Sequence, residues 1–152
     1  MHVMAYDPYI DLEYCADHGI ENSSLQQIIR EADVISLHLP LTEDTYHMID
    51  AKSIIEMKDQ VILVNTSRGG IIDEAAACEG LKSGKIGGLG LDAYEQEPPT
   101  GSPLFEYNNV LVTPHAGAHT VEAKKNMADM AVQNLLDVLT GKQCNYIVNP
   151  IQ

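Results

Sequence analysis

The chain has 152 residues, 45% hydrophobic and 20% charged, which suits one soluble globular domain. Its 9 Lys and Arg stand against 22 Asp and Glu, so the formal net charge is −13. This balance excludes a nucleic-acid binder, which needs a basic face for the phosphate backbone. A dinucleotide ligand stays possible, because backbone N–H groups and helix N-termini hold pyrophosphate without Lys or Arg.

Short apolar runs bounded by turn residues predict five strands: His2–Tyr6, Val34–Leu39, Val61–Asn65, Gly88–Asp92 and Val110–Thr113. Capping residues and apolar spacings of three and four predict helices between or after them: Ser24–Ala32, Ala51–Met57, Asp73–Ser83 and Thr120–Thr140. Gly84 and Gly141 are placed to end the last two. Strands alternating with helices through short connections predict an α/β fold with a doubly wound parallel sheet.

Two packing predictions follow from the apolar patterns. The unbroken run Val61–Val64 is typical of a strand buried on both faces. In the last helix, Met127, Ala131 and Leu135, followed by Val138 or Leu139, form one stripe that we expect to pack inward.

The cysteines and the chain's ends bear on its compartment. Three widely spaced cysteines without a C-x-x-C pair favour a reducing cytosol: Cys15, Cys78 and Cys144. No apolar run approaches the roughly 20 residues of a membrane span, and the first residues lack a secretory leader. We therefore expect a cytoplasmic protein with no membrane partner. We also expect no metal, because His2, His18 and His47 show no metal-ligand spacing.

Polar residues follow three of the predicted strands. Arg68 comes after the strand that ends at Asn65, Glu97 after the one that ends at Asp92, and His115 after the last strand. Ligands of open parallel sheets bind at the carboxyl edge, where these residues would gather. Arginine can hold a carboxylate through two hydrogen bonds, and histidine exchanges protons near neutral pH. Taken singly, each could equally be a surface ion pair, a solvated acid or a hydrogen-bonded loop histidine.

Asp7 closes the first predicted strand and precedes Pro8. An acid in this position of a dinucleotide-binding unit accepts hydrogen bonds from the adenosine ribose, and its charge disfavours a 2′-phosphate. It therefore favours NAD over NADP. By itself, Asp-Pro is also a common turn signal.

Several of these segments resemble the D-isomer-specific 2-hydroxyacid dehydrogenases. The family's three signature segments are similar to Asn65–Asp73, Leu91–Pro98 and Thr113–Ala118, and the loop after its fourth nucleotide-domain strand is similar to Leu37–Thr45. The similarity runs from His2 to about Asn149. It implies NAD as the cofactor, a small 2-hydroxy or 2-keto acid as the substrate, hydride transfer as the reaction, and a homo-oligomer, specifically a dimer.

The resemblance assigns roles to three catalytic residues. Arg68 would hold the substrate carboxylate, and His115 would exchange a proton with the substrate oxygen. Glu97 would pair with His115; formate-dehydrogenase-like members, which place Gln there, are thereby disfavoured.

On the cofactor side, Asp7 would hold the ribose, and Leu39 and Pro40 would line the adenosine side. Thr66 and Asp92 would lie near the nicotinamide ribose and carboxamide, and Gly117 and Ala118 would close over the ring. The full set of implied cofactor contacts is Asp7, Leu39, Pro40, Thr45, Thr66, Ser67, Asp92, Gly117 and Ala118.

The chain also departs from the family pattern. No strand and G-x-G-x-x-G loop precede His2, and the glycines of Gly84–Gly90 follow a helix, the wrong order for a phosphate loop. We expect residues 1–152 to be a partial Rossmann-like NAD-binding domain without the substrate-binding domain, acting as an enzyme fragment. The alternative is a non-catalytic remnant or a corepressor-like oligomerisation module.

The missing first strand is central in the order 3-2-1-4-5-6. Its neighbours are the strands predicted at His2–Tyr6 and Val34–Leu39, so three outcomes are possible. These two strands pair directly, another chain supplies the missing pairing, or the N-terminal strand detaches.

Overall fold

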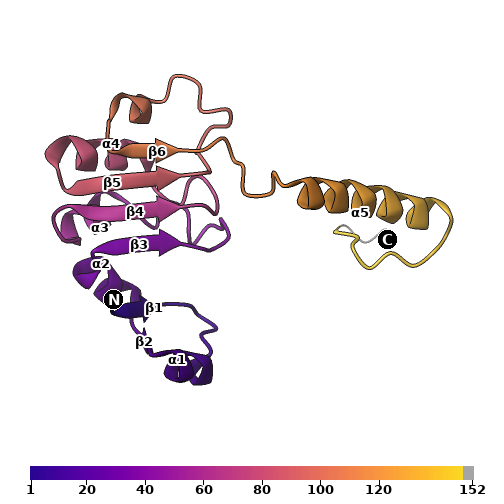
Figure 1. Cartoon of the computed structure of the whole chain (residues 1–152), viewed down its shortest axis with the longest axis horizontal. Helices are drawn as coiled ribbons and strands as arrows, with labels where there is room; N and C mark the ends of the chain where they lie inside the picture. The colour runs from indigo at the N-terminus through magenta and orange to yellow at the C-terminus, as the bar shows by residue number, and fades with distance from the viewer. Residues whose placement is uncertain (149–152) are drawn as a thin grey trace. The chain divides into compact units, whose positions relative to one another are not determined.

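The computed structural model describes residues 1–148. The chain divides into two units, Met1–His115 (unit 1) and the residues from Ala116 onward (unit 2). All strands of the described residues belong to unit 1, and the long helix α5 belongs to unit 2 (Figure 1).

Unit 1 is built on a four-stranded parallel sheet in the order β3-β4-β5-β6 (Figure 1). Its strands are β3 (Val34–Leu37), β4 (Val61–Asn65), β5 (Ile86–Leu91) and β6 (Val110–Val112). Asn65 pairs with Leu37 on one side and with Leu91 on the other, and Leu91 pairs with Val112. The strands therefore end together, and the loops that follow them leave from one edge. The predicted parallel α/β fold is confirmed.

A second, two-stranded parallel sheet pairs β1 (Val3–Ala5) with β2 (Ile20–Asn22), joined through α1 (Leu12–His18). The sequence analysis missed α1 and β2, which are too short to show a clear period. Within residues 1–148, β1 pairs with β2 and not with β3. Direct pairing of the strand predicted at His2–Tyr6 with the strand predicted at Val34–Leu39 is therefore wrong. The N-terminal strand β1 instead pairs with β2 in a separate sheet.

Three helices of unit 1 begin at polar caps, as the sequence predicts: α2 (Leu25–Glu31), α3 (Ala51–Glu56) and α4 (Glu74–Ser83). The side chains of Ser24, Asp50 and Asp73 each accept a backbone N–H from the first turn. Gly84 ends α4 with a φ of 79°, a left-handed conformation that costs glycine little. The short 3₁₀ helix η1 (Pro103–Glu106) was not predicted.

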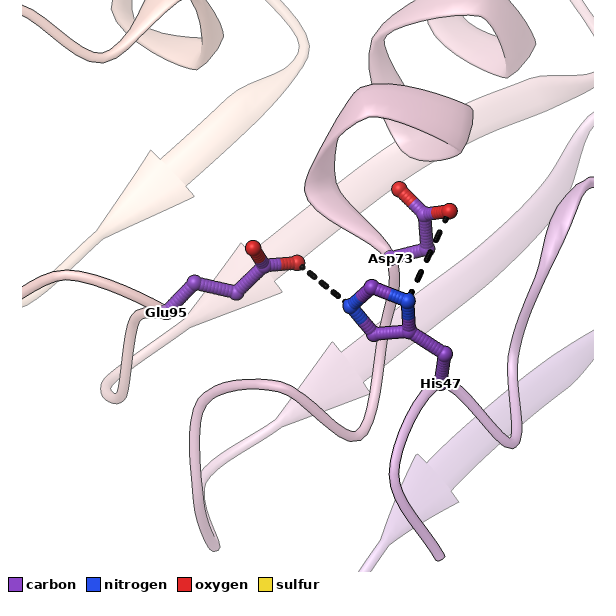
Figure 2. A group of neighbouring side chains, drawn as sticks. All are labelled: His47, Asp73 and Glu95. Atoms are coloured by element: carbon purple, nitrogen blue, oxygen red, sulfur yellow. Dashed lines mark hydrogen bonds and ion pairs between the residues drawn. The ribbon is translucent and has the colours of Figure 1, made fainter.

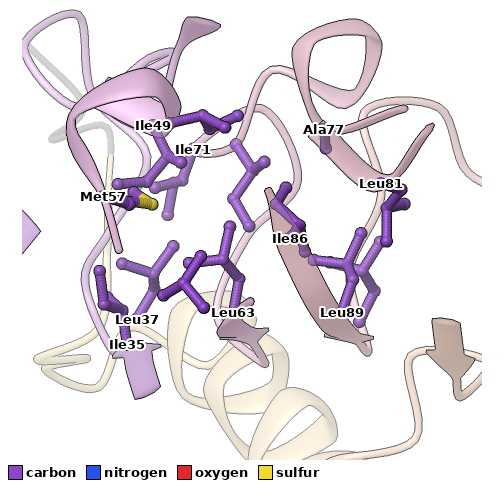
Figure 3. Packing of buried hydrophobic residues seen from close by; sticks show 14 of the residues in the cluster. Ile35, Leu37, Ile49, Met57, Leu63, Ile71, Ala77, Leu81, Ile86 and Leu89 are labelled. Carbon is purple, nitrogen blue, oxygen red and sulfur yellow. The ribbon is translucent and has the colours of Figure 1, made fainter. Parts of the chain in front are cut away.

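The helices cover one face of the four-stranded sheet. The buried cluster includes Ile29 of α2 and Ile54 of α3. Figure 3 shows Leu81 of α4 packed with the strand residues Leu63 and Leu89. The prediction that β4 is buried on both faces is wrong: Leu63 is 0% exposed, whereas Ile62 is 44% exposed. Within unit 1, helices from α2 to α4 pack on only one set of alternating side chains, so the other set stays open.

Helix α5 (Val121–Leu139) has the predicted extent, with Thr120 as its N-cap. The prediction that its apolar stripe packs inward is wrong, since no residue of α5 is buried and Met127 and Leu135 are 53% and 59% exposed. Among the described residues of unit 2, α5 is the only helix or strand, so no second element of that part packs on the stripe. No helix within residues 1–148 has the length and apolarity needed to cross a membrane.

One-sided burial of β4 predicts unequal costs for neighbouring truncations. Leu63→Ala should lower the free energy of unfolding by about 2–5 kcal/mol, because it leaves a cavity in the core. Ile62→Ala, the matched control on the open face, should cost less than about 1 kcal/mol. Urea unfolding followed by circular dichroism measures both values. Equal costs would show that the second face is covered as well.

Candidate active site

The Arg68 loop is held by the last residue of β4. Asn65 is 1% exposed, and its Oδ1 accepts hydrogen bonds from Ser67 N at 3.1 Å and Ser67 Oγ at 2.8 Å. Its Nδ2 donates to the carbonyl of Arg68 at 2.8 Å. Arg68 itself is exposed, and its Nη1 donates to Ser67 O at 2.8 Å. The loop backbone is thus fixed, and the guanidinium leaves it at the sheet edge. Sequence reasoning assigned Asn65 no role.

The loop after β4 passes directly against the loop after β5. A Cβ built on Gly69 would lie 1.8 Å from the carbonyl oxygen of Tyr94 and 2.6 Å from the amide nitrogen of Glu95. Only glycine allows this approach of two backbones. The position of Arg68 is therefore tied to that of the segment 94–97.

Glu97 and His115 form the predicted pair. His115 Nδ1 lies 2.9 Å from Oε1 and 2.8 Å from Oε2 of Glu97. The hydrogen bond from His115 lowers the pKa of Glu97, the N–H of Tyr94 assists at 3.2 Å, and the Arg68 charge adds a smaller effect. Arg68 is therefore close enough to act on Glu97. Glu97 engages Nδ1, so Nε2 is the ring atom that could exchange a proton with a ligand.

Tyr94 links the strand ends behind this pair. Its hydroxyl donates to the carbonyl of Thr113 at 2.6 Å, two residues before His115. Thr113 Oγ1 donates to Oδ1 of the buried Asp92, whose N–H donates to Asn65 O at 3.0 Å. Burial raises the pKa of Tyr94, which keeps its donor proton in place. The loops that carry Arg68, Glu97 and His115 are thus connected by one hydrogen-bonded network at the ends of the strands.

A pocket of about 400 Å³ opens beside Arg68. Thr45 does not line the pocket but holds the loop that does, since its Oγ1 donates to Pro40 O at 2.8 Å and accepts from Thr42 N at 2.7 Å. The pocket gathers four of the predicted cofactor contacts, Leu39, Pro40, Thr66 and Ser67; its full lining is His38, Leu39, Pro40, Leu41, Thr66, Ser67 and Arg68.

Five predicted cofactor contacts are not among the residues that line this pocket: Asp7, Thr45, Asp92, Gly117 and Ala118. Asp7 follows β1, and its Oδ1 accepts the N–H of Tyr9 at 2.7 Å, which makes it the turn residue that Asp-Pro also predicted. Gly117 and Ala118 belong to unit 2. Their roles toward a cofactor, like those of Asp7, stay predictions.

The structure also assembles a group that the sequence did not reveal. His47 Nε2 lies 3.1 Å from Glu95 Oε1, and its Nδ1 lies 3.7 Å from Asp73 Oδ2 (Figure 2). These residues come from three separate loops, so no sequence spacing predicts that they lie close together. One ligand atom from each lies within 4.8 Å of the others.

A parallel α/β sheet with polar loops at its carboxyl edge is the architecture of a nucleotide-binding domain. The comparisons with known proteins make this specific: the model of the D-isomer specific 2-hydroxyacid dehydrogenase NAD binding domain matches residues 1–117. The chain belongs to this family.

Individual relatives agree with this assignment. The chain is 42% identical over 150 residues to a D-3-phosphoglycerate dehydrogenase of Methanocaldococcus jannaschii, covering 98% of this chain and 29% of that protein. It superposes on the apo-structure of D-lactate dehydrogenase from Escherichia coli with a TM-score of 0.87 and 39% identity, over 98% of this chain and 47% of the other. For the Aquifex aeolicus D-lactate dehydrogenase solved with NAD and lactic acid, the TM-score is 0.87 at 33% identity, over 99% and 51%. The chain thus spans about half or less of these relatives.

The pairing of Glu97 with His115 predicts a linked titration. His115→Asn keeps a residue that tolerates the left-handed φ of 51° but removes the imidazole, so the pKa of Glu97 should rise toward its ordinary value. Carboxyl ¹³C NMR across an acid titration measures this pKa. His18→Asn, which changes an exposed histidine in α1, is the control and should leave it unchanged.

The sign for stability follows from the same shift. Because folding lowers the pKa of Glu97, the pair stabilises the fold above the unfolded pKa, and this contribution disappears as the pH falls through the folded pKa. His115→Asn should therefore flatten the acid limb of the unfolding free energy. An unchanged acid limb would contradict the pairing.

Gly69→Ala should force the two loops apart, because the new Cβ meets backbone that cannot move aside. We expect a loss of about 1–3 kcal/mol in unfolding free energy and an altered Glu97 titration. Gly88→Ala is the matched control, since its nearest atom would lie 3.8 Å away. Denaturant unfolding of both variants tests this, and similar free energies would refute the close approach.

Proposed function

We propose that this chain forms the NAD-binding, catalytic part of an oxidoreductase that transfers hydride between NAD(H) and a D-2-hydroxy acid or its 2-keto acid. The observation that carries the proposal is the Glu97–His115 pair, formed at the same sheet edge as Arg68 and within reach of its charge. Family membership supports it, as does the likeness to an enzyme solved with NAD and lactic acid.

Each side chain has a role that its surroundings support. The exposed guanidinium of Arg68, on a loop fixed by Asn65, binds the substrate carboxylate through two parallel hydrogen bonds. His115 gives a proton from Nε2 to the keto oxygen during reduction and takes it back during oxidation. Glu97 holds the ring by Nδ1, which leaves Nε2 directed to the substrate oxygen.

The chain's residues also fit the cofactor. The pocket beside Arg68 joins apolar Leu39 and Pro40 to the hydroxyls of Thr66 and Ser67, a lining suited to a flat ring with ribose hydroxyls. When bound, NAD(H) supplies or accepts the hydride. Asp7 favours NAD over NADP, because its charge repels a 2′-phosphate.

Three further assignments belong to this proposal. Residues 1–152 form part of an NAD-binding domain, in line with the partial coverage of the relatives. The three free cysteines suit the cytoplasm. The exposed apolar side chains of α5 suit association into a homodimer.

Cofactor binding and turnover test the function directly. Isothermal titration calorimetry should show NADH binding to the chain and weaker binding of NADPH. Reduction of pyruvate, glyoxylate and related 2-keto acids is then followed by the loss of NADH absorbance. Absence of binding at millimolar NADH would overturn the proposal, and binding without turnover would favour the non-catalytic alternative.

Two variants separate the proposed roles. His115→Asn should lower kcat by about 10²–10⁴-fold, because it removes the proton donor. Arg68→Lys should chiefly raise KM for the acid, because an ammonium cannot reproduce the two-point contact. NADH affinity is the control for both variants and should change little. A variant of His115 with full kcat would remove that residue from the mechanism.

A further inference from the structure

His47 stands between two acids from different loops. Its Nε2 is hydrogen-bonded to Glu95 Oε1 at 3.1 Å, and its Nδ1 faces Asp73 Oδ2 at ion-pair distance, 3.7 Å (Figure 2). All three side chains are partly buried. The His47 ring is thus hydrogen-bonded to Glu95 on one side and lies against Asp73 on the other.

This arrangement continues into the first turn of α4. Glu95 N donates to Glu74 Oε1 at 2.8 Å, and Glu74 N donates to Glu95 Oε1 at 2.9 Å. This reciprocal pair attaches the loop after β5 to the helix at two points. We name the four residues His47, Asp73, Glu74 and Glu95 the His47 clamp.

The clamp has a rigid base. His47 N donates to Gly70 O at 2.7 Å, and Asp73 N donates to Ile49 O at 3.0 Å, so the backbone on either side is paired. Asp73 also caps α4, since its Oδ1 accepts the N–H of Ala76 at 3.0 Å. Movement of Glu95 away from this base would require its bonds to His47 and Glu74 to break.

Glu97 lies two residues after Glu95. Within segment 94–97, Tyr94 N donates to Glu97 Oε1, and Tyr94 Oη connects the segment to Thr113 O at 2.6 Å and to Leu91 O at 3.4 Å. Fixing Glu95 therefore limits where the Glu97 carboxylate can lie. The carboxylate must meet His115 Nδ1 at 2.8 Å for the pair to form.

We propose that the His47 clamp is a positioning device, which holds segment 94–97 so that Glu97 meets His115. Its four members touch neither substrate nor cofactor and act through Glu97. The importance of this for turnover rests on the proposed function, whereas the positioning itself is a property of the folded chain.

A metal ion is the competing use of these ligands. Both acids already accept backbone N–H groups at the N-terminus of α4, where the helix dipole favours anions over cations. The two ring nitrogens of His47 face different acids, and a single metal ion can bind only one ring nitrogen. The geometry therefore favours the hydrogen-bonded clamp over a metal site.

The test compares two disruptive variants with two controls in the chain without cofactor or substrate. His47→Asn, which tolerates the left-handed φ of 50°, and Glu95→Ala each break the clamp. Glu95→Gln keeps an oxygen that accepts the N–H of Glu74. His2→Asn removes a His–Glu pair of similar length, 3.0 Å to Glu21, in the two-stranded sheet.

Carboxyl ¹³C NMR reports the pKa of Glu97 in each variant. We expect it to rise toward its ordinary value in His47→Asn and Glu95→Ala, and to stay at the wild-type value in Glu95→Gln and His2→Asn. A Glu97 pKa unchanged in both disruptive variants, even with a lower unfolding free energy, would mean a merely structural role and overturn the proposal. A saturable shift of the His47 ring signals by Zn²⁺, abolished in Asp73→Asn, would overturn it in favour of a metal site.

Turnover gives a second readout if the proposed function holds. Glu95→Ala should lower kcat about ten- to a hundredfold with little change in KM, because the proton donor is misplaced while substrate binding persists. Glu95→Gln should restore most of the rate, and wild-type kcat in Glu95→Ala would count against the proposal. The NMR titration needs no turnover, so failure of the dehydrogenase function leaves the positioning test intact.

Discussion

The parallel register of β4, β5 and β6 is the constraint on which the rest of unit 1 depends. Asn65, Leu91 and Val112 lie side by side, so each following loop starts from the same edge. The burial of alternate residues such as Leu63 against the helices holds this register. A slip of one residue would turn that apolar set outward. The chemistry of the edge is therefore stabilised by the core beneath it.

The segment 94–97 is where the loops of that edge meet. Gly69 lets the Arg68 loop pass against it, Tyr94 reaches the carbonyl of Thr113, and Glu97 binds His115. Glu95 connects it to α4 and His47. A displacement of segment 94–97 would therefore be felt by the Arg68 loop and by His115. Substitutions at positions that do not contact a ligand, such as Gly69 and Glu95, can thus alter the geometry of Glu97.

Electrostatics at this edge is local. The chain carries a formal charge of −13, so its overall field does not draw anions toward the sheet. Under the proposed function, recognition of the substrate acid would come from short-range contacts, for which Arg68 has the right fork of donors. The charge of Arg68 also helps Glu97 to stay ionised beside His115. The same arginine would then serve both substrate binding and the Glu97–His115 pair.

The sequence by itself determined the parallel α/β class, the caps at Ser24 and Asp73, and the pairing of Glu97 with His115, because alternating apolar runs, capping residues and short motifs are local signals. It could not reveal the His47 clamp, the contact of Gly69 with Tyr94, the one-sided burial of β4 or the exposure of α5. Those depend on distances between segments far apart in the chain and on which faces have neighbours. Only the tertiary structure decides such distances, since no periodicity records them.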